Sequence, residues 1–343
     1  MDQVVIHLLN GLSAGLLLFM LSAGLTLIFS MMGVLNFGHA SFYLLGAYFA
    51  YALAGALGFW LALLVAPVLT GFVGAAFERF VLRRVHAHGH VPELLVTFGL
   101  GYVVLELVQL VWGRAALPFS PPPALQGAAF TWVQHSVEGH RLVLGAAPAA
   151  LCTAASAEVS VSCARFPMTR AFMMAVALGM LLALWLLLKR TRTGLVIQAA
   201  LTHPDMVQAL GHNVPRVFMA VFGGGCALAG LAGVIGGVTF VTEPQMAAIG
   251  PILFAVIVIG GIGSLRGAFV GSLVVGLSQT LPLAVNGSLA SLLQSLGLAV
   301  GPQTPGWPLF RITAAQAAPI LPYLLLVLIL VLRPKGLLGT RET

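Results

Sequence analysis

The chain has 343 residues, of which 59% are apolar and only 7% are charged. Because a water-soluble domain carries about 25% charged residues, this composition excludes an ordinary soluble protein and indicates that lipid is the main solvent. The 16 lysines and arginines outnumber the 9 aspartates and glutamates, but they form short clusters between apolar runs. This pattern indicates membrane topology and excludes a nucleic-acid-binding protein, whose basic residues would follow a polar face.

Apolar runs long enough to cross a bilayer, which takes about 20 residues in a helix, recur along the chain. The run at 249–284 is too long for one crossing, and glycines interrupt it, which predicts either two spans or one span and a re-entrant segment. The sequence therefore predicts a single all-α membrane domain over residues 1–343, a polytopic bundle of eight or nine spans. The predicted spans are 9–31, 38–57, 59–78, 92–112, 171–188, 217–238, 249–284 and 318–332.

The first apolar run continues into Asn36 and His39 without an intervening polar loop. Lipid offers no hydrogen-bond partner to an amide or an imidazole, so both side chains must face protein or water. Gly33 and Gly38 flank them, which predicts a break in the helix beside a cavity. Asn36 and His39 are therefore the first candidates for a translocation path, with capping of the broken helix as the alternative role.

Lysine and arginine predict the orientation. Eleven of the sixteen lie in 79–84, 189–216 and 333–341 and at Arg266. The positive-inside rule assigns these segments to the cytoplasm. Alternation then places the N-terminus and the segments 113–170 and 285–317 outside, and the C-terminus in the cytoplasm.

The extracytoplasmic segment 113–170 is rich in proline, alanine and serine. Residues 135–144 favour a short hairpin, and 146–163 have the composition of a polar insertion. Cys152 and Cys163 lie in this segment, and an exported loop allows a disulfide between them.

The cytoplasmic loop 189–216 contains a short amphipathic pattern. Thr202 is a candidate N-cap, and Pro204 and Asp205 suit the first turn of a helix. Met206, Val207 and Leu210 form an apolar face, and Gly211 suits a left-handed end of the helix. An exposed apolar face needs a cover. The two interpretations are a helix on the lipid surface and a coupling helix that docks into a groove of an ATPase.

Two apolar runs carry a small residue at every fourth position, which lets helix backbones approach closely inside a membrane bundle. Helix packing is therefore the expected role of these residues, and a substrate path lined by bare backbone is a compatible alternative. The residues are Gly225, Ala229, Gly233 and Gly237 in one run, and Gly263, Gly267 and Gly271 in the other.

Two carboxylates are further candidates for the translocation path. Glu106 lies within a span, where a carboxylate is costly unless it is paired, and a hydrogen bond to a neighbouring helix is its alternative role. Glu243 follows a glycine-rich run at its outer end, where it suits an outer gate, a contact with a binding protein, or an ordinary loop position. Histidines at 86, 88 and 90 alternate in a basic loop that we expect to be solvated, with an adventitious metal site as the alternative, and no metal site is predicted.

The sequence offers no catalytic set such as Ser-His-Asp. It also lacks the Gly-x-x-x-x-Gly-Lys-Ser/Thr phosphate loop, because neither Lys189 nor Lys335 precedes a serine or threonine. These observations predict that the chain is not an enzyme and that it binds no cofactor, ATP included, by this device.

Four segments resemble the permease subunit of branched-chain amino acid ABC importers, the LivH type. Ala199 and Gly211 match an alanine and a glycine of the family's cytoplasmic loop, whereas Gln198 and Arg266 stand where many members carry arginine and proline. The resemblance covers most of the chain. The four segments are 24–40, which contains Asn36 and His39; 193–200 with 209–214; 260–268; and 332–339.

The resemblance implies an inner-membrane protein that moves substrate by alternating access. Its partners would be two ATPase subunits that use the ATP, a second related permease and a periplasmic substrate-binding protein. An apolar amino acid suits a path lined by glycine, alanine and leucine, and helix N-termini would receive its carboxylate. Related permeases carry urea or short amides. The residues coupled to the ATPases would be Ala199, Thr202, Asp205, Met206, Leu210 and Gly211.

Two hypotheses of other classes stand beside this one. An ion-coupled secondary transporter predicts acidic residues at mid-membrane, for which Glu106 is thin support, and it leaves the cytoplasmic amphipathic pattern unexplained. An intramembrane enzyme predicts a catalytic set within the spans.

Overall fold

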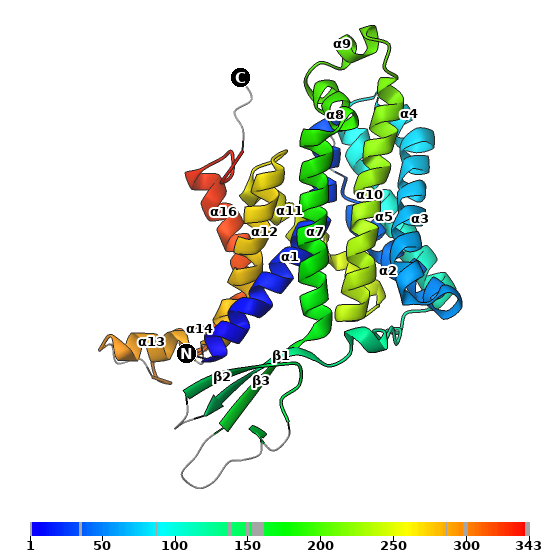
Figure 1. Cartoon of the computed structure of the whole chain (residues 1–343). Helices are drawn as coiled ribbons and strands as arrows, with labels where there is room; N and C mark the ends of the chain where they lie inside the picture. Colours follow the sequence, from blue (N-terminus) through cyan, green and yellow to red (C-terminus); the bar gives the residue numbers. More distant parts are fainter. Residues whose placement is uncertain are drawn as a thin grey trace.

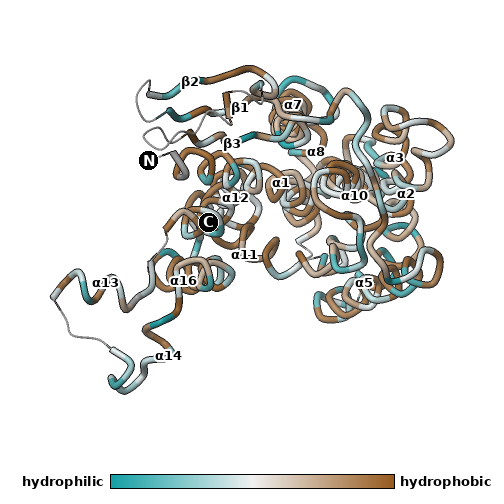
Figure 2. Tube along the Cα trace, turned by 90° about the horizontal axis from the view of Figure 1, so that it is seen from below, coloured by the Kyte–Doolittle hydropathy of each residue, from teal (hydrophilic) through white to brown (hydrophobic). Residues whose placement is uncertain are grey.

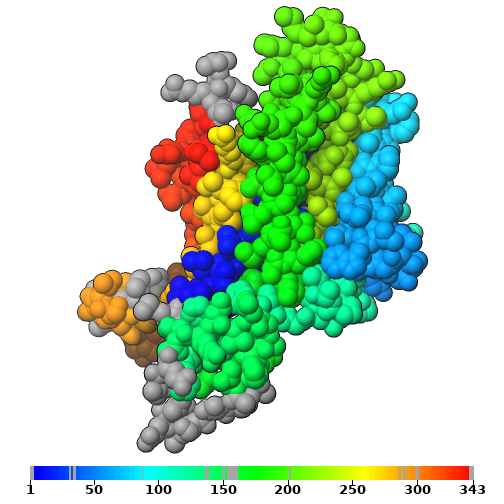
Figure 3. All heavy atoms as spheres, viewed as in Figure 1, coloured from blue at the N-terminus to red at the C-terminus, as the bar shows by residue number. Residues whose placement is uncertain are grey.

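The computed structural model describes residues 2–33, 36–86, 88–135, 139–148, 151–152, 161–285, 287–297 and 301–339. Long helices stand side by side in a bundle, and a small sheet projects from one end (Figure 1, Figure 3). This end is called the sheet end here. The opposite end carries the short helices α4, α8 and α9, and most arginines and lysines of the chain lie there, so it is called the basic end.

Eight helices in the described part of the chain are long and apolar enough to cross a membrane, which confirms the predicted polytopic helical bundle. Several are extended by a turn of another helix type. They are α1 (Asp2–Met32), α2 (His39–Leu57), α3 (Phe59–Phe77) with η1 (Glu78–Leu82) and α4 (Arg83–His86), α5 (His90–Trp112), α7 (Met168–Arg190), α10 (Val214–Thr239), α12 (Leu265–Thr280) with η4 (Leu281–Ala284), and α16 (Leu321–Leu332) with α15 (Ala314–Ala317) and η5 (Ala318–Ile320).

The long apolar run at 249–284 forms two helices. A 3-10 turn, η3 (Pro244–Ile249), leads into α11 (Gly250–Gly260), and α12 packs against α11. Gly261 and Gly263 have φ of 108° and 81° in the turn between them, a conformation that favours glycine. The N-terminus lies at the sheet end and the chain leaves α16 at the basic end (Figure 1). The chain must therefore pass between the two ends of the bundle an odd number of times. In the described chain, α11 supplies the pass that is needed in addition to the eight long helices.

The centre of the bundle is formed by α1, α2, α3 and α10, and α12 packs along the other side of α1. Aromatic contacts fix these neighbours: Phe42 meets Phe222 with ring centroids 6.3 Å apart, and Phe19 meets Phe269 at 5.2 Å. By contrast, α5 and α16 leave most of their surface exposed, and both lie at the periphery (Figure 2). Surface of this kind faces lipid or another protein.

A three-stranded antiparallel sheet occupies part of the segment 113–170, so the chain is all-α only within the bundle. The predicted hairpin at 135–144 was too short, because β1 already begins at Ala128, and its burial alternates at Thr131 and Val133 without an alternation of apolar and polar residues. Other parts of the predicted polar insertion lie outside the described residues. The strands are β1 (Ala128–His135), β2 (Gly139–Leu144) and β3 (Val161–Pro167), in the order β2-β1-β3, and η2 (Pro123–Leu125) precedes them.

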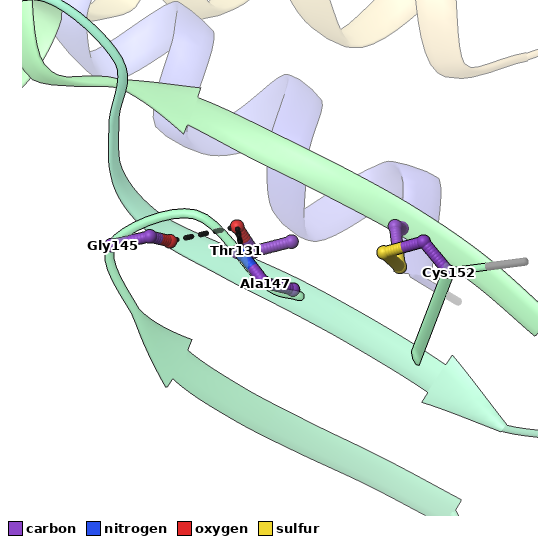
Figure 4. Close-up of a disulfide and its surroundings, with 5 residues drawn as sticks. Thr131, Gly145, Ala147 and Cys152 are labelled. Atoms are coloured by element: carbon purple, nitrogen blue, oxygen red, sulfur yellow. Dashed lines mark hydrogen bonds between the residues drawn. A yellow bond between two sulfur atoms is a disulfide. The ribbon is translucent and has the colours of Figure 1, made fainter. Parts of the chain in front are cut away.

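The segment after β2 folds back over the sheet (Figure 4). The Thr131 hydroxyl donates to the Gly145 carbonyl at 2.8 Å and accepts from the Ala147 N–H at 3.1 Å. Cys152 and Cys163 form a disulfide. The pairing that the sequence allowed but did not decide is therefore present, and it joins the returning segment to β3.

The remaining helices are short. α8 (Arg192–Thr202) and α9 (Pro204–Ala209) connect α7 to α10 at the basic end, whereas α13 (Leu289–Ser295) and α14 (Trp307–Phe310) lie near the sheet end (Figure 1). The segments predicted to share the cytoplasmic side and those predicted to lie outside thus occupy opposite ends of the bundle.

Candidate functional site

A cavity of about 810 Å³ opens on one side of the bundle. Its wall comes from the turn after α1 and from α1, α2, α5, η3, α11 and α16. None of the described residues that line it is aspartate, glutamate, lysine or arginine. Amides, one histidine and aromatic side chains make parts of its wall polar. The lining residues are Leu25, Asn36, Phe37, His39, Ala40, Ser41, Phe98, Gly101, Tyr102, Leu105, Gln109, Pro244, Gln245, Ala247, Ala248, Gly250, Pro251, Leu253, Phe254, Tyr323 and Leu326.

Asn36 is the most unusual residue of the cavity wall. Its side chain is 2% exposed, and neither its amide nitrogen nor its amide oxygen has a hydrogen-bond partner within the described chain. A buried polar group without a partner costs about 1–3 kcal/mol, and such groups are rare in folded proteins. An amide left in this state at a cavity wall is well placed to bind water or a polar part of a substrate.

His39 lies one helical turn further along, at the start of α2. Its Nε2 is 3.2 Å from the Leu21 carbonyl oxygen of α1, and its Nδ1 has no partner among the described residues. The contact with α1 fixes the ring, and the second nitrogen is left for a ligand or water. The break predicted beside Asn36 and His39 is therefore present, and both residues line the cavity.

The local sequence explains the break. α1 ends at Met32, and Gly33 takes φ 65°, which favours glycine over any residue with a side chain. A Cβ on Gly38 would lie 2.6 Å from the Thr97 carbonyl oxygen of α5, so only glycine lets the turn pass this close to α5. The Ser41 hydroxyl donates to the Gly38 carbonyl at 2.6 Å, which satisfies one backbone group of the turn.

Glycines of α10 allow α2 to pack closely against this helix. A Cβ on Gly233 would fall within 3.0 Å of the Tyr43 carbonyl oxygen of α2, and one on Gly237 would lie 3.2 Å from the Cβ of Ala47 on the same helix. A further close backbone approach between these helices, however, joins Gly46 to Gly230. The predicted four-residue stripe did not include this pair.

The second glycine stripe needs a correction. Gly267 packs against the Gly260 backbone of α11, and a Cβ on Gly271 would lie 2.6 Å from the Val256 carbonyl oxygen. Gly263, in contrast, lies in the turn between α11 and α12, where a Cβ would come no closer than 3.5 Å to its nearest neighbour, the Ser30 hydroxyl. The prediction that Gly263 packs between helices was wrong, because the helix begins only at Leu265.

Glu243 precedes η3 near the sheet end of the cavity. Its carbonyl accepts from the Met246 N–H at 3.1 Å and so begins the 3-10 turn. The two residues that follow it, Pro244 and Gln245, line the cavity, but Glu243 itself does not. The structure therefore places Glu243 beside the site and not within it.

Glu106 does not line the cavity, contrary to the prediction that it belongs to the translocation path. Its neighbours on α5, Tyr102, Leu105 and Gln109, face the cavity, whereas Glu106 lies on the exposed flank of the helix. The sequence could not reveal this, because α5 is apolar almost all round and shows no preferred face.

The loop at the basic end also differs from its prediction. Thr202 is the last residue of α8 and caps nothing: its hydroxyl donates to the carbonyl of Ala199, at 3.3 Å. His203, with φ −140°, separates α8 from α9, because the residue before a proline avoids the helical conformation. Asp205 lies in the first turn of α9.

The apolar residues of α9 do not share one face. Val207 is buried against the bundle, whereas Met206 and Leu210 are 67% and 80% exposed. Gly211 takes φ 88° after the helix ends, the left-handed conformation expected there. The exposed part of the predicted apolar face is therefore Met206 and Leu210, to which α8 adds Leu195, also exposed.

Two buried carboxylates near the basic end were not selected from the sequence, because no local pattern distinguishes them. Glu78 is bound by the Arg83 guanidinium, with Nη2 to Oε2 at 2.9 Å, and that guanidinium also donates to the Pro215 carbonyl. Glu93 is contacted by His86 and by His90. The histidines predicted to be solvated thus partly serve to pair a buried carboxylate. Within the described residues no group of His, Cys, Asp and Glu is arranged to hold a metal ion.

Comparison with known proteins gives a consistent result. Residues 7–330 match the family described as the permease component of branched-chain amino acid transport systems. The high-affinity branched-chain amino acid transport permease LivH of Escherichia coli K12 is 25% identical over 353 residues, which cover 98% of this chain and 96% of that protein. BraD of Pseudomonas aeruginosa, a permease of the same description, is 24% identical over 348 residues with the same shares.

A shorter similarity joins the chain to an archaeal protein. A probable branched-chain amino acid transport permease LivH of Methanocaldococcus jannaschii is 30% identical over 112 residues, or 31% of this chain and 34% of that one. The matches to the bacterial permeases extend over nearly the whole chain, which confirms the resemblance drawn from the four sequence segments.

Proposed function

The chain belongs to the family of permease components of branched-chain amino acid transport systems, and we propose that it is the membrane subunit of an ABC importer for branched-chain or other apolar amino acids. The observation that supports this best is the neutral, largely apolar cavity with the unpartnered Asn36 amide in its wall. The protein is a multi-pass membrane protein. We place it in the inner membrane, with its basic end and C-terminus in the cytoplasm.

The cavity suits a small molecule without net charge. An apolar side chain would contact rings such as Phe37 and Phe254, whose centroids are 6.1 Å apart, and the Asn36 amide and His39 Nδ1 would contact polar atoms of the substrate. A free ion would find no charged side chain in the described lining. These properties favour a zwitterionic apolar amino acid over a strongly charged substrate.

The energy would come from partner subunits, because this chain has no phosphate-binding loop. Met206 and Leu210 project from α9 at the basic end, and an exposed apolar pair on a short helix is suited to a groove in another protein. We propose that one of the two ATPase subunits docks here, and that Ala199, Asp205 and Gly211 shape the same surface. ATP binding and hydrolysis would then shift the bundle between outward-open and inward-open states.

The other proposed partners are a second related permease and a periplasmic substrate-binding protein. The binding protein would deliver substrate at the sheet end, near Glu243. The disulfide between Cys152 and Cys163 is of a kind that persists in an oxidising compartment, which supports an extracytoplasmic location of the sheet.

The family match argues against an ion-coupled secondary transporter, as does the absence of carboxylates from the described cavity lining. A related permease for urea or short amides is the alternative within the class, since an unpartnered amide would also bind such substrates.

Docking of the ATPases is tested by Leu210→Asp in the chain co-expressed with the ATPase subunits of the proposed importer. We expect the variant to reach the membrane but to lose the ATPases on purification. Gln208→Asp is the matched control, because Gln208 is an exposed polar residue of the same helix, and it should retain them. Normal recovery of the ATPases with Leu210→Asp would refute the coupling role of α9.

The substrate is tested by uptake of labelled leucine, with labelled urea in parallel, in cells that lack this gene and in complemented cells. Loss of leucine uptake that the native gene restores, and Asn36→Leu does not, is the expected result. Unchanged leucine uptake with lost urea uptake would replace the proposed substrate.

A further inference from the structure

Glu106 differs from the other carboxylates of the spanning helices. Glu78 is paired with Arg83, and Glu93 is contacted by two histidines. No hydrogen bond or ion pair reaches Glu106 from the residues that the structure describes, and its side chain is exposed on the surface of α5. This subunit alone therefore leaves the charge of Glu106 without a partner.

The depth of Glu106 makes this exposure costly. It lies six residues before the end of α5 at Trp112, which is about 9 Å along the helix at 1.5 Å per residue. Val103, Leu107 and Leu110 surround it and are themselves exposed, as expected for a surface within the apolar layer. Because a carboxylate facing lipid is disfavoured, we expect another protein to cover Glu106 in the working assembly.

The cavity opens on the same side of the subunit. Tyr102, Leu105 and Gln109 of α5 form one of its edges, and Tyr323 of α16 contributes to the other. Figure 2 shows α5 and α16 on the same side of the bundle, with α11 set back between them. Glu106 borders the cavity-facing stripe of α5, so a protein that closes the cavity from this side also covers Glu106.

A second copy of this chain is a poor candidate for that protein. In a symmetric pair the same surface meets itself, and α2, α5, η3, α11 and α16 contain no lysine or arginine. His39 is buried, and His90 lies 16 residues from Glu106 on α5, or about 24 Å along the helix. A copy would thus offer no cation at the required depth and would add a second carboxylate.

We infer that the α5–α16 side of the cavity binds a second, non-identical permease subunit that presents a lysine or arginine side chain to Glu106. The inference rests on the proposed function, which supplies a second permease, and it adds the surface, the contact residue and the chemistry of the partner. The charge of Glu106 then selects the mixed pair over the pair of identical subunits.

Photo-crosslinking in the assembled complex tests the surface without altering Glu106. A photoreactive amino acid replaces Leu110, which is 82% exposed on α5, or Phe72, which is 68% exposed on α3, in the chain co-expressed with the second permease and the ATPases of the proposed importer. We expect position 110 to crosslink to the second permease and position 72 not to do so. Crosslinking of position 110 to another copy of this chain, or to no protein, would overturn the inference.

Substitution of Glu106 tests the chemistry. Glu106→Gln keeps a hydrogen-bonding group and should retain the second permease, whereas Glu106→Leu should weaken the pair about three- to fifteen-fold, the range typical of one hydrogen bond between membrane helices. Glu106→Lys should lose the partner, and an acidic residue at the crosslinked site of the partner should restore it. If Glu106→Lys retains the native amount of partner, the proposed contact is wrong.

The outcomes separate the two proposals. Recovery of the ATPases reports on α9, which is at the opposite end of the chain's fold from the outer part of α5, and it also shows that a Glu106 variant has folded. If native chain retains the ATPases but Glu106 variants leave the second permease unaffected, only the present inference fails. If the native chain never retains the ATPases, the proposed function fails.

Discussion

Gly233 allows a quantitative test of how the wall of the cavity is held together. It lies on α10, where α2 crosses, and a Cβ at this position would come within 3.0 Å of the Tyr43 carbonyl oxygen and to 2.9 Å from the Ala47 nitrogen. Both neighbours are backbone atoms and cannot rotate away. Gly233→Ala therefore forces α2 and α10 apart.

The expected effect combines two opposing terms. Replacing glycine by alanine within a helix stabilises it by about 0.5–1 kcal/mol, whereas overpacking an interior contact costs about 1–3 kcal/mol. Gly224→Ala in the same helix should show only the stabilising effect, because a Cβ at Gly224 would meet no atom within 4 Å. Gly233→Ala should thus be about 1–3 kcal/mol less stable than Gly224→Ala.

Thermal unfolding of the purified complex in one detergent measures this difference. The unfolding midpoint of Gly224→Ala should equal or exceed that of the native protein, and the midpoint of Gly233→Ala should fall by several degrees. Uptake should fall with it, because Tyr43 and Ala47 belong to the helix that presents His39 to the cavity. Equal midpoints for the two variants would refute the argument that close approach of α2 and α10 depends on Gly233.

Three further changes have defined outcomes. Cys163→Ser removes a disulfide that closes a loop with a sequence separation of 11, which should destabilise the sheet by about 3 kcal/mol; protease cleavage at the sheet end should increase while the midpoint of the bundle stays constant. Arg83→Leu leaves the buried Glu78 without its ion pair and should cost about 1–3 kcal/mol; adding Glu78→Leu should restore part of the midpoint, and no recovery would contradict the pairing. Gly38→Ala should abolish uptake, whereas Gly55→Ala, where a Cβ meets nothing within 4 Å, should not; equal uptake by both would show that the turn tolerates a side chain.

The positions of most spans could be predicted because lipid imposes one requirement on every crossing, a long run of apolar residues. The same requirement drew attention to Asn36 and His39, since a polar residue within such a run needs a special environment. Both line the cavity. For 249–284 the sequence could not decide between two spans and one span with a re-entrant segment. Glycines predict a turn there, but they do not show whether the chain crosses the membrane on both sides of it.

Where a helix is apolar on all sides, the sequence could not predict which of its residues face the bundle and which face outward. Glu106 was therefore placed in a span, but the side of α5 on which it lies, away from the cavity lining, could not be predicted. A similar limit applied to α9, where Val207 and Leu210 have helical spacing but point to the bundle and to solvent respectively. Contacts between distant segments, such as Gly46 with Gly230, leave no sign in local spacing at all.

Buried polar groups of this protein fall into two classes, and the difference indicates where function lies. Glu78 and Glu93 are buried near the basic end, and each has partners that compensate its burial. Asn36 and His39 are buried to a similar degree, yet three of their side-chain atoms have no partner among the described residues. Thr26, Tyr48, Trp132 and Thr242 also have a buried polar atom without a partner in the described chain, each at a cost of about 1–3 kcal/mol, but none of these four residues lines the cavity. The place of Asn36 and His39 in the wall of an uncharged cavity therefore points to a partner that arrives from outside the chain, which is the property a transport site requires.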